Sequence, residues 1–100
     1  MPYDARKLAT QLKSKLGAVE EPGRHMQYKV YAEGRLVGST GISHGAKEID
    51  DSLAGAMAKQ LCISLSVFRG IYRCPAGWEE YKDDHDPNRN PIIPYRTPWD

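Results

Sequence analysis

Apolar residues recur at helical spacing near the start of the chain. Positions 5, 8, 9, 12 and 16 are alanine or leucine, a spacing that places them on one face of an α-helix. The Asp4 carboxylate is placed to cap the start of this helix, and Gly17 is placed to end it in the left-handed conformation. The pattern therefore predicts a first helix between these two residues.

An alternation with a period of two follows at residues 25–31. Met26, Tyr28 and Val30 fall on one face of a predicted strand, because successive side chains of a strand point to opposite sides. The other face is mostly polar and carries His25, Gln27, Lys29 and Tyr31. Such an alternation is typical of a strand with one buried and one open face.

Two further strands are predicted beside this one. Residues 32–35 suit a tight turn in which Gly34 supplies a positive φ, and residues 36–42 then return as a glycine-containing strand. Residues 18–21 are predicted as a short strand that Pro22 interrupts, because proline cannot donate to a ladder.

Three helical pieces are predicted after the strands. The N-cap candidates of the first are Asp50, Asp51 and Ser52, and its expected buried stripe is Leu53, Met57 and Leu61. Ser64 is placed to cap a short second piece, and Pro75 suits the first turn of the last one. The apolar side chains of these two pieces are Val67, Phe68, Ile71, Trp78 and Tyr81.

This order of elements predicts an α+β fold for residues 1–82. Helices cover one face of a small antiparallel three-stranded sheet in the order α-β-β-β-α, and the other face stays open. Residues 83–100 contain four prolines and are predicted to form an extended arm, which rests on the domain or on a neighbouring chain. We expect His85, which lies among aspartates, to belong to a solvated acidic linker at the start of this arm.

The chain has 100 residues and a formal net charge of +1. This length predicts one small domain without a large enzyme cleft. The near-neutral charge argues against a nucleic-acid binder that acts through net charge alone. The first third is nevertheless locally basic, and the first helix carries Arg6, Lys7, Lys13 and Lys15, which either contact phosphates or form a solvated surface.

The N-terminal residues lack the pattern of a secretion signal, and no stretch approaches the roughly 18 apolar residues that span a membrane. We therefore expect a cytoplasmic protein in which Cys62 and Cys74 are reduced, partly buried thiols, whereas export would allow them to form a disulfide. Two cysteines without further ligands at a useful spacing do not indicate a zinc site, and no metal or cofactor is expected.

Residues 47–68 resemble the C-terminal half of HicA-type toxins, small messenger-RNA interferases with a double-stranded-RNA-binding-domain-like (dsRBD-like) fold. In that family a histidine and a Lys-Glu-aliphatic run lead into a helix, followed by a glutamine, a serine cap and a phenylalanine. The matching positions are His44, Lys47, Glu48, Ile49, Gln60, Ile63, Ser64 and Phe68. The first helix and a Gly-x-His at Gly23–His25 follow the same order, so the resemblance covers residues 4 to 70.

The resemblance implies an endoribonuclease in which His25 is the catalytic residue. RNA supplies its own nucleophile, the 2′-hydroxyl, so cleavage needs a group that takes this proton and cations around the phosphate. A histidine titrates near neutral pH, and Arg24 and Lys29 lie close to His25 along the chain. His44 and Lys47 precede the second helix, where they either contact phosphate or simply form the turn.

Two functions are thus open from the sequence. The first is a HicA-like toxin that binds and cleaves messenger RNA without a metal, together with an antitoxin that covers the open sheet face. The second is a non-catalytic dsRBD-like binding or assembly subunit, which docks a partner through Tyr95 and Trp99 of the arm. The sequence Gly23-Arg24-His25, where the family has serine or threonine in the middle, favours the second.

Overall fold

The computed structural model describes residues 3–73 and 75–89. The elements in chain order are β1 (Tyr3–Asp4), α1 (Ala5–Leu16), β2 (Val19–Glu21), β3 (Met26–Ala32), β4 (Arg35–Ile42), β5 (Glu48–Ile49), α2 (Asp51–Gln60), α3 (Leu65–Arg73), α4 (Trp78–Asp84) and a 3-10 turn, η1 (Pro87–Arg89). Within the described ranges the chain thus forms four α-helices and two small sheets, which confirms the predicted α+β class.

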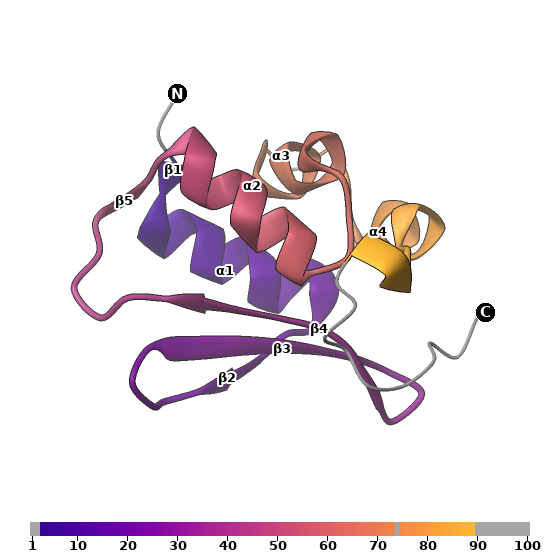
Figure 1. The fold of residues 1–100 in the computed structure, drawn as a ribbon, viewed down its shortest axis with the longest axis horizontal. Coiled ribbons are helices and arrows are strands. Elements are labelled where there is room, and N and C mark those ends of the chain that lie inside the picture. Colours follow the sequence, from indigo (N-terminus) through magenta and orange to yellow (C-terminus); the bar gives the residue numbers. More distant parts are fainter. Residues whose placement is uncertain (1–2, 74, 90–100) are drawn as a thin grey trace.

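The larger sheet is antiparallel with the strand order β2-β3-β4, and β1 pairs with β5 in a separate two-stranded sheet. Helices α1 and α2 lie on one face of the larger sheet (Figure 1). Tyr28 and Val30 are buried on this face, whereas Tyr31 on the opposite face is 40% exposed. The alternation predicted for β3 is therefore confirmed, with its apolar face turned toward the helices.

Local signals place the turn and the helix ends as predicted. Asp4 and Asp50 each accept a hydrogen bond from a backbone N–H in the first turn of the helix that follows, at 3.1 and 2.7 Å, and the Ser64 hydroxyl does so at 3.2 Å. Gly17 ends α1 with φ 64°. The turn between β3 and β4 is a two-residue hairpin turn with positive φ at Glu33 and Gly34.

The buried stripe of α2 differs from the predicted one. Leu53 is 47% exposed, and the side chains that α2 buries are Ala54, Met57 and Ala58. Ala54 starts the inward face, and Met57 and Ala58 lie three and four positions on, as expected for one side of a helix. The expected Leu53 position is therefore wrong, although Met57 and Leu61 are fully buried as predicted.

The last helix also begins later than Pro75 suggests. The Ala76 N–H donates to the Gly70 carbonyl at 3.2 Å, which keeps the chain in a turn against α3. Gly77 is then the N-cap, and α4 starts at Trp78. Tyr81 is fully buried in this helix, and its hydroxyl donates to the Leu61 carbonyl at 2.9 Å.

A β-bulge lies in β4 opposite the middle of β3. Val30 pairs with Gly38 and Tyr31 pairs with Leu36, so Val37 is the extra residue of the bulge. Its carbonyl accepts a hydrogen bond from His85 Nε2 at 2.7 Å. This contact joins the segment after α4 to the sheet.

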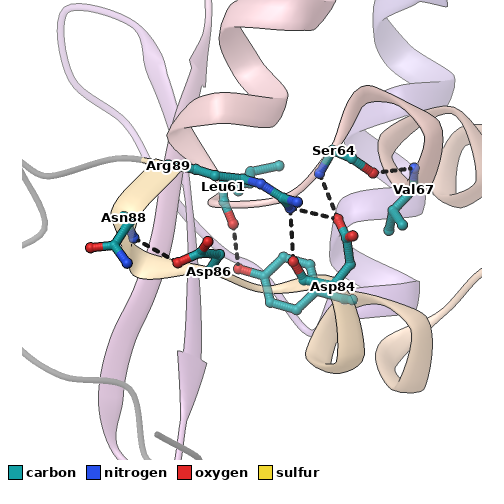
Figure 2. Close-up of polar contacts among 8 residues, drawn as sticks. Leu61, Ser64, Val67, Asp84, Asp86, Asn88 and Arg89 are labelled. Atoms are coloured by element: carbon teal, nitrogen blue, oxygen red, sulfur yellow. Dashed lines mark hydrogen bonds and ion pairs between the residues drawn. The ribbon is translucent and has the colours of Figure 1, made fainter.

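The expectation of a solvated linker around His85 is wrong. His85 is only 9% exposed, and the following Asp86 N–H donates to the Cys62 carbonyl at 2.9 Å. Figure 2 shows Asp84 between Ser64 and Arg89. The Asp84 carboxylate accepts a hydrogen bond from the Ser64 N–H at 2.6 Å and forms an ion pair with Arg89 at 2.8 Å. Long-range pairing of this kind outweighs the local acidic and proline-rich composition.

The predicted arm at residues 83–100 therefore begins with residues that pack against the domain. The remainder of that segment, residues 90–100 with Tyr95 and Trp99, lies outside the described residues, as does Cys74. Cys62, the other cysteine, is fully buried.

Candidate nucleic-acid interface

Two loops meet at one end of the larger sheet. The β2–β3 connection and the β4–β5 connection both lie at this end, close to the start of α1 (Figure 1). His44 Nε2 donates to the Gly23 carbonyl at 2.8 Å, so the two loops are joined by a hydrogen bond. We call this region the basic end and define it by Arg6, Arg24, His25, His44 and Lys47.

Backbone pairing holds Lys47 beside the first turn of α1. The Ala5 N–H donates to the Lys47 carbonyl at 3.0 Å, and the β1–β5 pairing continues this contact through Asp4 and Glu48. Arg6 follows directly in α1. Two cations that are distant in the sequence are thereby fixed on neighbouring segments.

A groove of about 530 Å³ lies between α1, β3 and the β4–β5 loop. We call it the α1 groove. Its apolar lining includes Ala5, Ala9, Met26 and Ile42, and its basic lining consists of Arg6, Lys13, His44 and Lys47. A smaller hollow of about 300 Å³ is lined by Asp4, Arg6, Ala46 and Lys47. Arg6, Ala46 and Lys47 are common to both hollows, so these residues stand where the two meet.

Glu20 is the acidic side chain of the α1 groove. Its Oε2 accepts a hydrogen bond from the Tyr28 hydroxyl at 2.9 Å and lies 3.5 Å from Lys13 Nζ. Burial, reinforced by this hydrogen bond to the carboxylate, raises the pKa of Tyr28 to about 12. Tyr28 therefore stays a neutral donor at physiological pH and orients Glu20 within the groove.

His25 is exposed and lies on the other side of the sheet from the α1 groove. Gln27 pairs with Gly41, and a methyl group added at Gly41 would lie 2.9 Å from Gln27 Nε2 and 3.5 Å from His25 Cβ. These side chains are therefore on the open face, whereas Met26 between them faces the groove. No hydrogen bond to the His25 imidazole is formed by residues 3–73 or 75–89.

Lys29 is the one predicted site residue that lies away from the basic end. It sits further along β3 on the open face, where its Nζ is 3.3 Å from Glu21 Oε1. The charge of Lys29 is therefore partly balanced within the sheet. The cations Arg24 and Lys47 are exposed and have no ion pair with any residue of the described ranges.

The basic side chains expected on one face of the first helix lie in two different environments. Arg6 and Lys13 line the α1 groove, whereas Lys7 stacks its ammonium 4.7 Å from the centre of the Tyr72 ring. Their spacing of seven residues, which is nearly two helical turns, was the available signal for Arg6 and Lys13. No sequence pattern singles out Glu20, because the groove that this residue lines forms only in the folded protein.

Fold and site together define a small α+β protein with a basic, grooved sheet end. No family model, curated protein or solved structure matches the chain. In the part of the chain that the structure describes, no three His, Cys, Asp or Glu residues group as metal ligands, and no helix is long and apolar enough to cross a membrane.

Proposed function

We propose that the protein is a HicA-like, dsRBD-like RNA-binding protein that cleaves messenger RNA with His25. The observation that carries this proposal is the meeting of two loops at the basic end, with His25 on the open sheet face and His44 and Lys47 lining the α1 groove. Arg24, His25, His44 and Lys47 come from two loops that the His44–Gly23 hydrogen bond holds together. Between α1 and α2 the chain forms the three strands of the larger sheet and the short strand β5, and both helices lie on one face of that sheet, which supports the resemblance.

The chemistry proposed for His25 uses only RNA and side chains. A neutral imidazole takes the proton of the 2′-hydroxyl, and the resulting oxygen attacks the adjacent phosphorus. The bond from phosphorus to the 5′-oxygen of the next nucleotide breaks, and that oxygen leaves with a proton from solvent. The products are a 2′,3′-cyclic phosphate and a 5′-hydroxyl, and Arg24, the residue before His25, is proposed to offset the charge that develops on the phosphate.

The proposed partner is an antitoxin-type protein that contacts the open sheet face. No described helix covers this face, and it carries two exposed apolar side chains, Val19 at 48% and Tyr31 at 40%. A protein bound there would also cover His25. The proposal therefore predicts that binding of the partner prevents RNA cleavage.

Replacing His25 tests the catalytic role directly. We expect the full chain to cleave a mixed RNA in the presence of EDTA and to leave 2′,3′-cyclic phosphate ends. His25→Ala should lower the cleavage rate by at least about 100-fold, because a positioned general base contributes about that much. Cleavage that H25A leaves unchanged would remove the assignment.

RNA binding has its own test, because the fold can bind without cutting. Arg24→Ala and Lys47→Ala should each weaken RNA binding and reduce the dependence of log K on log salt by about 0.7, which is the expected value for one lost contact with single-stranded RNA. Lys59→Ala, an exposed cation on α2, is the matched control and should leave both unchanged. Absence of RNA binding by the unchanged protein would contradict the proposal.

One observation favours the non-catalytic alternative. The His25 imidazole has no hydrogen-bond partner among the described residues, whereas catalytic bases are commonly oriented by a neighbouring group. In this second candidate function the basic end binds RNA and His25 is only a contact. RNA binding without cleavage products in the assay above would select it.

A further inference from the structure

We infer that the α1 groove binds one unpaired nucleotide of RNA and selects guanine through Glu20. This inference rests on the proposed function, RNA binding, and is independent of the proposed cleavage by His25. It concerns the helix side of the sheet, where none of the chemistry proposed above takes place. The base would occupy the larger hollow, with its phosphate where the two hollows meet.

The dimensions and lining of the groove suit a base with an attached phosphate. Its volume of about 530 Å³ lies within the range of about 300–1,000 Å³ found for small-molecule sites. Ala9, Met26 and Ile42 offer the apolar surface that the faces of a base require. Sequence-specific recognition of RNA mostly uses unpaired bases, because side chains cannot read the deep, narrow major groove of an RNA duplex.

The positions of Arg6 and Lys47 indicate where the phosphate of the nucleotide binds. Arg6 and Lys47 line both hollows, and neither has an ion pair within the described ranges. A phosphate between them would receive charge-assisted hydrogen bonds from both. The base attached to it then extends into the larger hollow, toward Lys13 and Glu20.

Glu20 supplies the selectivity. An ionised carboxylate only accepts hydrogen bonds, so the base edge that faces it must present donors. Glu20 Oε2 already contacts Tyr28 and Lys13, while Oε1 has no hydrogen bond from the described residues. Guanine presents two donors, N1–H and N2–H, side by side, whereas adenine, cytosine and uracil each present one donor next to an acceptor on their pairing edges.

The test measures binding of six-nucleotide 2′-O-methyl oligouridines with one central guanine, inosine or adenine. The 2′-O-methyl group prevents cleavage through the 2′-hydroxyl. We expect guanine to bind about tenfold more tightly than adenine, with inosine, which lacks the N2 amino group, between them. Arg6→Ala should weaken all three oligonucleotides by a similar factor and preserve their order.

Glu20→Gln should abolish the difference between guanine and adenine. Glu21→Gln is a matched control, since Glu21 is the next residue of β2, faces the opposite side of the sheet and also pairs with a lysine. The base series on the unchanged protein tests the inference even if Glu20→Gln does not fold. Equal affinity for guanine and adenine, or a preference that Glu20→Gln retains, overturns this inference alone. If neither the oligonucleotides nor mixed RNA bind, the proposed RNA-binding function itself is overturned.

Discussion

Asp84 shows at the scale of one residue how a charged side chain can link separate segments of a fold. Burial opposes its ionised form, but the hydrogen bond from the Ser64 N–H and the contact with Arg89 outweigh this and lower the pKa of Asp84. The carboxylate thereby holds together the start of α3, the end of α4 and the η1 turn. An acidic residue in a run of aspartates is thus a structural link rather than part of a solvated surface.

Replacing this carboxylate by its neutral isostere should destabilise the protein. Because the pKa of Asp84 is lower in the folded state than in the unfolded state, its contribution is fully present above the unfolded value and is lost as the pH falls through the folded value. We expect Asp84→Asn to reduce the free energy of unfolding by about 1–2 kcal/mol at pH 7, and by progressively less as the pH falls below about 3.9, the ordinary pKa of an aspartate.

Urea denaturation at several pH values measures this difference. Asp83→Asn is the control, because Asp83 is exposed and adjacent, and it should match the unchanged protein within about 0.5 kcal/mol. A deficit of Asp84→Asn that is the same at pH 7 and below pH 3 would contradict the charge-based explanation.

At the scale of elements, the packing of α4 on β4 depends on a glycine. A methyl group added at Gly38 would lie 2.7 Å from the Tyr81 hydroxyl and 3.1 Å from the Leu61 backbone. The hydroxyl is itself held by its bond to the Leu61 carbonyl, so it has little room to move away. Gly38 therefore permits close contact between strand and helix rather than only weakening the strand.

Gly38→Ala should lower the free energy of unfolding by about 1–3 kcal/mol, because overpacking forces shifts of backbone and side chains. Gly55→Ala is the contrasting substitution. Gly55 lies in α2 with no atom within 4 Å of the added methyl group, so this change should stabilise the protein by about 0.5–1 kcal/mol. Thermal unfolding of both variants checks the pair, and a Gly38→Ala variant as stable as the unchanged protein would refute the packing argument.

The sequence predicts the elements well where local signals are sufficient. The caps at Asp4 and Asp50, the turn at Gly34 and the alternation in β3 each depend on neighbours within a few residues, and all are confirmed. Leu53 shows where this reasoning fails, since one residue of helical rotation decides between the buried and the exposed side.

The candidate site depends on contacts that no local pattern contains. His44 and Lys47 are suggested by their sequence surroundings, but their proximity to Gly23 and Ala5 arises from loop and strand pairing across the fold. The α1 groove exists only after these segments meet. Glu20 could therefore be recognised only from the structure.

At the scale of the whole molecule, residues 85–89 complete the domain. They contribute the contact of His85 with Val37, the hydrogen bond from Asp86 to Cys62 and the ion pair of Arg89. A chain that ends at Asp84 should therefore be less stable than one that ends at Arg89 by about 3 kcal/mol, at about 1 kcal/mol for each contact. Denaturant unfolding compares the two shortened chains, and equal midpoints would show that these contacts contribute nothing.

The bulge at Val37 has a consequence for encounters between molecules. β4 is one of the two outer strands of its sheet, and an outer strand offers unpaired backbone groups to which a foreign strand can add. The irregular spacing at Val37 and the imidazole of His85 on its carbonyl remove the regular ladder that such an addition needs. The contact that joins residues 85–89 to the sheet thus also disfavours the addition of a second chain along β4.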